Sequence, residues 1–119
     1  MTTPGTRDLT VYRGNVYRHI VKFVEADANG VPLDPEVPIS QVGATWRAQV
    51  RADPDSPTVA ATFTFDTADA ATGVIVASLP GAQTALLTRD RYVWDLERID
   101  TDETLLAGEI TVIRDVSRD

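Results

Sequence analysis

The stretch RYVWDLERIDTDETLLAGEITVI, residues 91–113, decides the fold because it predicts two β-strands joined by a short acidic turn. Successive side chains of a strand point to opposite faces, so Tyr92, Trp94 and Leu96 share one face. The other face carries two carboxylates and is expected to meet water. A two-stranded hairpin is only marginally stable by itself, so the rest of the chain must supply more sheet.

The returning strand, residues 105–113, contains a glycine that bears on how the strands pair. Its inward-facing residues are expected to be Leu106, Ile110 and Val112. Gly108 falls inside the strand, where glycine often marks a bulge or the close approach of another backbone. We expect Trp94, on the preceding strand, to cover the space that Gly108 leaves.

Five further segments have the composition or the alternation of strands. They are residues 9–12, 16–24, 44–50, 59–65 and 74–79. The alternation is cleanest in 44–50, where Trp46 begins the inward set, and in 59–65, where Phe63 and Phe65 belong to it. The expected core anchors are Trp46, Phe63, Phe65, Tyr92, Trp94 and Leu96.

The connections between these strands carry turn and helix signals. Asn29-Gly30 is a strong hairpin-turn signal, and prolines make residues 31–43 an extended loop rather than a strand. Residues 80–88 begin with a proline and contain good helix formers, so one short helix is expected there. About seven short strands with turns every ~8–12 residues predict an all-β antiparallel sandwich or barrel.

The length and the composition limit the class of protein. At 119 residues, one domain is expected, spanning 9–114 between a flexible N-terminal arm of residues 1–8 and a C-terminal tail of residues 115–119. The chain has no cysteine, which excludes disulfides and thiolate zinc sites.

Charge and hydropathy limit the partners and the location. The net charge is −7, and the arginines are scattered among carboxylates, so neither nucleic acid nor an anionic membrane is an expected partner. No apolar run approaches the ~20 residues of a membrane span, and the N-terminus lacks the features of a signal peptide. We therefore expect a soluble protein that is made in a cytoplasm.

No group of residues predicts catalysis. His19 is the single histidine, and it shares the parity of Tyr17, Val21 and Phe23, which favours a structural role over that of a general base. Asp95 and Glu97 have a spacing that could suit glycosidase chemistry, but both are expected to face open solvent without a cleft. We expect no enzyme activity and no cofactor.

Ligand binding is the alternative that the residues leave open. Hard oxygen ligands gather in two loops and give weak calcium candidates: Asp27, Asn29, Asp100, Asp102 and Glu103. Neither loop completes an EF-hand, and Asp and Asn are common in turns for backbone reasons. A carbohydrate-binding module would need exposed aromatic residues in a row, whereas Trp46 and Trp94 both fall in the apolar sets.

The order and spacing of several segments carry a family resemblance over nearly the whole chain. They are YRGN (12–15), ANGVPLD (28–34), VGATWRAQVR (42–51), GVIVASLP (73–80), TALL (84–87), YVWDL (92–96), LLAGEITV (105–112) and VSR (116–118). This layout resembles small immunoglobulin-like β-sandwich proteins of tailed-phage virions, and is similar to the N-terminal domain of upper baseplate proteins. Two departures are the longer link at residues 35–41 and the lack of a receptor-binding or trimerising region after the sandwich.

The resemblance implies a non-enzymatic accessory subunit of a virion, in the tail or baseplate or as a head decoration. Its partners would be other virion proteins in a symmetric assembly, and it would be made in the host cytoplasm. The alternative is a monomeric carbohydrate- or calcium-binding sandwich module, and an enzyme is the third class.

Overall fold

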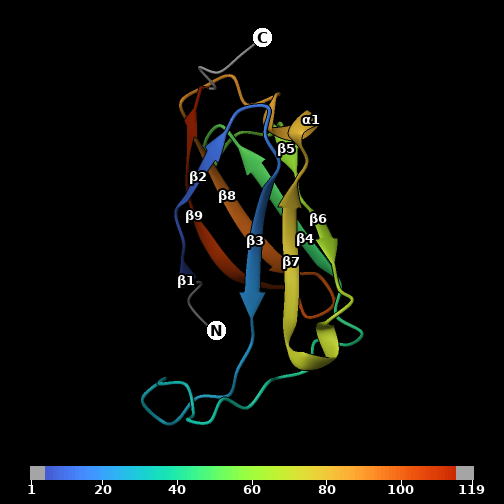
Figure 1. Ribbon diagram of the computed structural model, residues 1–119. Coiled ribbons are helices and arrows are strands. Elements are labelled where there is room, and N and C mark those ends of the chain that lie inside the picture. The colour runs from blue at the N-terminus through green and yellow to red at the C-terminus, as the bar shows by residue number, and fades with distance from the viewer. Residues whose placement is uncertain (1–4, 115–119) are drawn as a thin grey trace.

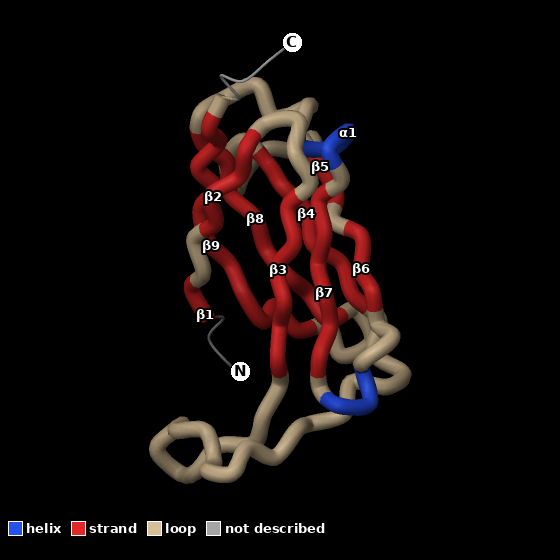
Figure 2. The backbone as a smooth tube through the Cα atoms, in the orientation of Figure 1, coloured by secondary structure: helices blue, strands red, loops and turns tan. Residues whose placement is uncertain are grey.

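The computed structural model describes residues 5–114 and contains two β-sheets that pack face to face (Figure 1). The strands are β1 (Gly5–Thr6), β2 (Leu9–Tyr12), β3 (Tyr17–Lys22), β4 (Trp46–Arg51), β5 (Ala61–Thr62), β6 (Thr64–Asp66), β7 (Val74–Leu79), β8 (Arg91–Arg98) and β9 (Glu103–Ile113). Two short helices complete the fold, a 3-10 helix at Ala70–Thr72 and α1 at Gly81–Thr84. Figure 2 shows the strands, helices and loops in different colours.

The strand order confirms the expected immunoglobulin-like sandwich. Sheet A has six strands in the order β1-β9-β8-β4-β5, with β2 also on β9, and sheet B has the order β3-β7-β6. If β3 is strand B of an immunoglobulin domain, these sheets correspond to GFCC′ and BED. The N-terminal strands β1 and β2 both run parallel to β9, whereas the pairs within the rest of the sheets are antiparallel.

The predicted β8–β9 hairpin lies at the centre of sheet A, and its inward face is buried as expected. Trp94 is directly opposite Gly108 in the register, which confirms the predicted pairing. A Cβ at Gly108 would lie 2.1 Å from the carbonyl oxygen of Arg7, so this position has no room for a side chain. The same carbonyl accepts a hydrogen bond from Trp94 Nε1 at 2.8 Å. Gly108 therefore allows the N-terminal segment to reach the indole.

Aromatic side chains connect the two sheets. The Tyr92 hydroxyl accepts a hydrogen bond from the Arg89 backbone N–H at 3.0 Å, which is the geometry of a tyrosine corner. In antibody domains the residue two positions later is the second cysteine of the inter-sheet disulfide. Here that residue is Trp94, whose ring contacts His19 of β3 edge-to-face, with centroids 6.2 Å apart. Phe63 packs on the same indole at 5.6 Å.

The predicted core anchors differ in how deeply they are buried. Phe63, Tyr92, Trp94 and Leu96 are buried, whereas Trp46 and Phe65 are half-buried and pack against the edge of the core. The Trp46 ring stacks on Phe23 with centroids 5.4 Å apart. Both tryptophans thus lie on the inner side of the sandwich, as their parity predicts.

The helix α1 closes one end of the sandwich through a buried threonine, Thr84, for which the sequence gives no signal. Thr84 Oγ1 accepts the Gly14 N–H at 3.0 Å and donates to the Asn15 carbonyl at 2.8 Å. A Cβ at Gly81 would lie 2.7 Å from the Gly14 carbonyl oxygen, so α1 sits directly on the β2–β3 turn. The helix was expected at residues 80–88 and is shorter, because a 3-10-like turn follows Thr84.

Two expectations about the strands need correction. The single strand expected at 59–65 is divided, because the chain crosses from sheet A at β5 to sheet B at β6. Phe63 stands at the crossing, where its N–H donates to Ala48 O of β4 at 3.0 Å. Residues 5–8 are also not a free arm, because β1 pairs with β9 and Asp8 Oδ1 accepts the Glu109 N–H at 3.0 Å. Residues 1–4 and the expected tail at 115–119 lie outside the described residues.

Candidate functional site

The structure separates the calcium candidates into two loops and gives two of their four carboxylates, Asp27 and Asp100, a local hydrogen-bond partner. Asp27 Oδ1 accepts the N–H groups of Asn29 and Val31 at 2.8 and 3.0 Å, which closes the Asn-Gly turn. Asp100 receives Nε and Nη2 of Arg98 and, through Oδ1, the Thr45 N–H. The hydrogen bond from Arg98, and then that from Thr45, lowers the pKa of Asp100.

Asp102 lies in the β8–β9 turn, in the left-handed region at φ 56°, and Glu103 is the first residue of β9, opposite Arg98. Within residues 5–114, no group of three or more potential metal-binding side chains is brought together. Asp27 thus closes a turn, and Asp100 binds an arginine and the Thr45 N–H.

His19 points into the sandwich from β3 and is half-buried against Trp94. Burial lowers its pKa, and the positive charge of Arg7 lowers it further. Both effects favour the neutral form of the ring. This placement agrees with the structural role that its parity predicts.

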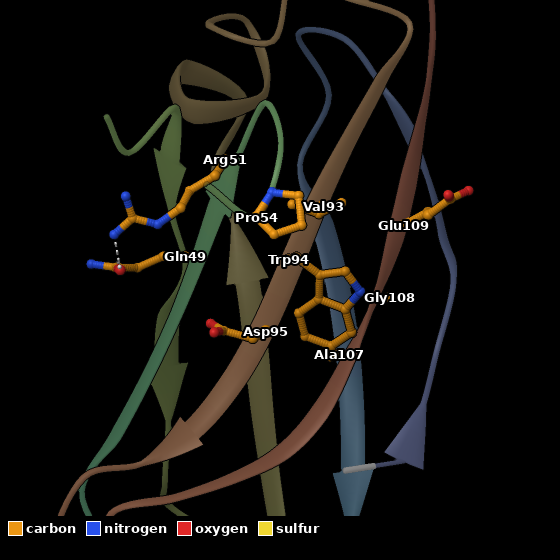
Figure 3. A pocket seen from close by; sticks show the side chains of 9 residues that line it. All are labelled: Gln49, Arg51, Pro54, Val93, Trp94, Asp95, Ala107, Gly108 and Glu109. Atoms are coloured by element: carbon orange, nitrogen blue, oxygen red, sulfur yellow. Dashed lines mark hydrogen bonds between the residues drawn. The ribbon is translucent and has the colours of Figure 1, made fainter. Parts of the chain in front are cut away.

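The outer face of sheet A carries a depression of about 410 Å³ (Figure 3). Its lining comes from three neighbouring strands and one turn: Gln49, Arg51, Pro54, Val93, Trp94, Asp95, Ala107, Gly108 and Glu109. The Arg51 guanidinium is occupied, because it donates to Ser56 O at 2.8 Å and to Gln49 Oε1 at 3.1 Å. None of the lining residues is a hydroxyl, thiol or imidazole nucleophile or base.

The carboxylates on this face do not form an acid–base pair. Glu97 is bound to Arg47 Nη2 at 2.6 Å, whereas Asp95 stands next to the depression. Partial desolvation raises the pKa of Asp95, and the Glu97 carboxylate raises it further against the opposing effect of Arg47 and Arg51. Of the two carboxylates whose spacing suited glycosidase chemistry, Glu97 is thus held in an ion pair and Asp95 lines the open depression.

The connection between β3 and β4 projects from the body of the sandwich as a two-legged ribbon (Figures 1 and 2). We call residues 24–39 the ribbon. Its legs are joined by isolated bridges at Val24↔Pro38 and Ala26↔Pro32. The radius of gyration is 15.4 Å, against about 13.5 Å for a compact domain of this length. The projecting ribbon accounts for part of this difference.

The base of the ribbon is fixed to the sandwich by close backbone contacts. The Ile39 N–H donates to Phe23 O at 2.9 Å, and the Phe23 N–H donates to Gly73 O at 2.7 Å. Gly73 has φ 80°, and a Cβ there would lie 2.6 Å from Phe23 O. Further out, the Glu25 N–H donates to Val37 O at 2.8 Å. The ribbon is therefore a preformed element held by its own hydrogen bonds.

The surface of the ribbon combines apolar and acidic side chains. Val31, Val37 and Ile39 are 55%, 40% and 42% exposed, so three apolar side chains of this short segment meet water. Its charged residues are all acidic: Glu25, Asp27, Asp34 and Glu36. Glu36 forms an ion pair with Lys22 at the end of β3. The sequence predicted a loop with a turn at this position, but not that it projects.

Comparisons with known proteins add little to this description. No protein-family model matches the chain, and the search of curated proteins returns no match. Among solved structures, the chain is similar to the NK cell receptor Nkp44, a triggering partner in natural cytotoxicity, at 9% identity and a TM-score of 0.39. That match covers 96% of this chain and 100% of the receptor chain, and at this level of similarity it carries no argument about function. In residues 5–114, neither helix approaches the length and apolar character that a membrane span requires.

Proposed function

We propose that this protein is a non-enzymatic accessory subunit of a tailed-phage virion, in the tail or baseplate or on the head. The resemblance of its segments to virion sandwich proteins supports the proposal, and the immunoglobulin-like strand order is consistent with it. Function in such a subunit lies in shape and surface. A rigid sandwich presents a docking element, and the net charge of −7 helps to keep the free subunit dispersed before assembly.

The projecting ribbon is the observation that carries the proposal. An isolated domain gains nothing from keeping Val31 and Val37 in water on a preformed hairpin, since burying each apolar side chain is worth about 1.5–3 kcal/mol. A preformed element also loses little conformational entropy on binding. The ribbon carries four carboxylates, of which Glu36 is paired with Lys22, and this negative charge favours a partner surface that combines apolar and basic side chains.

The test is incorporation into particles. Virions of the phage that encodes this chain are purified by density gradient and analysed by mass spectrometry, with wild-type protein expected in fixed stoichiometry. The double variant Val31→Ser/Val37→Ser is then supplied in place of the wild type and is expected to be depleted at least about tenfold, equivalent to 1.4 kcal/mol of binding.

The matched control is Leu86→Ser, which changes a side chain that is 55% exposed beside α1, at the opposite end of the sandwich (Figure 1). It should enter particles like the wild type. Absence of the wild-type protein from purified particles would overturn the proposal. Binding on a glycan array, or a calcium-dependent thermal midpoint, would instead support the alternative of a carbohydrate- or calcium-binding module.

A further inference from the structure

The edges of the two sheets differ in how far they can accept another strand. On sheet A, β5 has 2 residues, and the β1–β2 edge is interrupted at Arg7 and Asp8. On sheet B, β6 has 3 residues. The edge strand β3 is longer, with 6 residues in unbroken pairing with β7 and no further strand of sheet B beside it (Figure 1). Within the described residues, β3 therefore offers the longest continuous open edge.

The register shows which backbone groups of β3 face outward. Phe23 N–H donates to Gly73 O, one position beyond the Lys22↔Val74 pair, so Phe23 directs its N–H toward the β7 side. The direction of the backbone groups alternates along an antiparallel ladder, so His19 and Val21 also direct their N–H and C=O groups toward β7. Arg18, Ile20 and Lys22 consequently direct their N–H and C=O groups away from β7, toward the open edge.

The side chains of the same three residues lie on the outer face of sheet B. Ile20 is 67% exposed at the centre of the strand, between Arg18 and Lys22. Exposed sheet edges are commonly protected by proline, a bulge or a covering loop, and β3 has no proline and no register shift. Its basic residues give partial protection against strands that carry the same charge.

Charge decides between two occupants of this edge. A second copy of β3, paired antiparallel about a twofold axis that passes through Ile20, would put Arg18 opposite Lys22, and like charges directly opposite each other are destabilising. A strand with carboxylates at these two positions would instead meet opposite charges. Lys22 already contacts the carboxylate of Glu36, and Arg18 forms no ion pair with any described residue.

We propose that the open edge of β3 binds an extended segment of a partner protein that carries an apolar side chain flanked by two acidic ones, at alternate positions. The segment adds a fourth strand to sheet B. Backbone hydrogen bonds to Arg18, Ile20 and Lys22 supply affinity, and the alternating side chains supply selectivity. Since β3 leads directly into the ribbon, one partner can contact both, but this inference does not depend on the partner being a virion protein.

The test uses two capped peptides with the isolated protein, TETVTET and its basic counterpart TKTVTKT. Hydrogen exchange of the backbone amides is followed by NMR at saturating peptide. TETVTET should slow exchange at Arg18, Ile20 and Lys22 at least about tenfold, and leave β5, β6 and the β1–β2 edge unchanged. TKTVTKT should bind at least about tenfold more weakly.

Two variants keep the test decisive. Ile20→Pro removes one outward N–H from an edge strand without removing a bond to β7, and should abolish protection at this edge. The charge reversal Arg18→Glu/Lys22→Glu leaves the backbone intact and should exchange the preference from the acidic to the basic peptide. Equal binding of both peptides, or protection confined to another edge, would overturn the inference while leaving incorporation into particles as a separate question.

Discussion

At Gly108 another backbone segment approaches more closely than at any other glycine of the chain. The sequence predicted a close approach at this glycine and a tryptophan opposite it, and the structure identifies the approaching group as the Arg7 carbonyl. Gly108→Ala is expected to destabilise the protein by about 1–3 kcal/mol, because the added methyl displaces Arg7 from Trp94. Urea unfolding followed by tryptophan fluorescence measures this cost.

The control is Gly5→Ala, where the new Cβ meets the flexible tip of Leu106 at 3.2 Å and the Leu105 carbonyl oxygen at an ordinary 3.6 Å, and we expect a change within about 0.5 kcal/mol. Equal effects of the two substitutions would show that the Arg7 contact is not what restricts residue 108.

His19 should give the protein a measurable dependence on pH. Burial, and then Arg7, lower the folded-state pKa below the ordinary value of 6.5, so the unfolded state binds more protons just below that pH. The contribution to stability is therefore present above about pH 6.5 and is lost as the pH falls toward the folded-state pKa. His19→Phe keeps an aromatic ring beside Trp94 and removes the titration. Urea midpoints at about pH 5 and 7.5 should differ more for the wild type than for the variant, and identical differences would contradict this assignment.

At the scale of elements, one hydroxyl group, that of Thr84, joins α1 to the β2–β3 turn by hydrogen bonds. Thr84→Val preserves the shape of the side chain but leaves the Gly14 N–H and the Asn15 carbonyl without their partner, which should cost about 1–3 kcal/mol. Thr84→Ser retains the hydroxyl and should cost less, although it removes a buried methyl. Thermal unfolding of the three proteins orders them, and a valine variant at least as stable as the serine variant would show that packing outweighs the hydrogen bonds.

Strand positions could be predicted because alternation is a local property, whereas sheet membership could not. Residues 59–65 alternate without a break, and the inward parity of Phe63 is correct. The division into β5 and β6 arises because Thr62 pairs with Gln49 of β4 while Thr64 pairs with Ser78 of β7. No local signal marks this change of partner. The bonds of Thr84 likewise join segments about seventy residues apart and leave no pattern in the sequence.

At the scale of the whole molecule, the ribbon could be predicted only in part from the sequence. The Asn29-Gly30 turn and the prolines indicated an extended loop that returns on itself. The direction of the ribbon depends on backbone contacts among Phe23, Ile39 and Gly73. These residues are distant in the sequence, and because the contacts involve only main-chain polar groups, the side chains do not reveal them. Turn signals therefore predicted the position of the loop, whereas its projection and the exposure of its valines could be identified only from the structure.

Deletion of the N-terminal segment tests how much its contacts with β9 stabilise the protein. If residues 1–8 were a free arm, they could be removed without effect on stability. In the structure, however, the Arg7 N–H donates to Ala107 O, the Arg7 carbonyl accepts from Trp94 Nε1, and Asp8 Oδ1 accepts from the Glu109 N–H. At about 1 kcal/mol for each hydrogen bond, and with the β1 pairing also lost, deletion of residues 1–8 should cost about 3 kcal/mol or more. Asp8→Ala removes one of these bonds and should cost about 1 kcal/mol. Urea unfolding of both variants measures the difference, and a deletion that leaves stability unchanged would show that β9 does not need the segment as its neighbour.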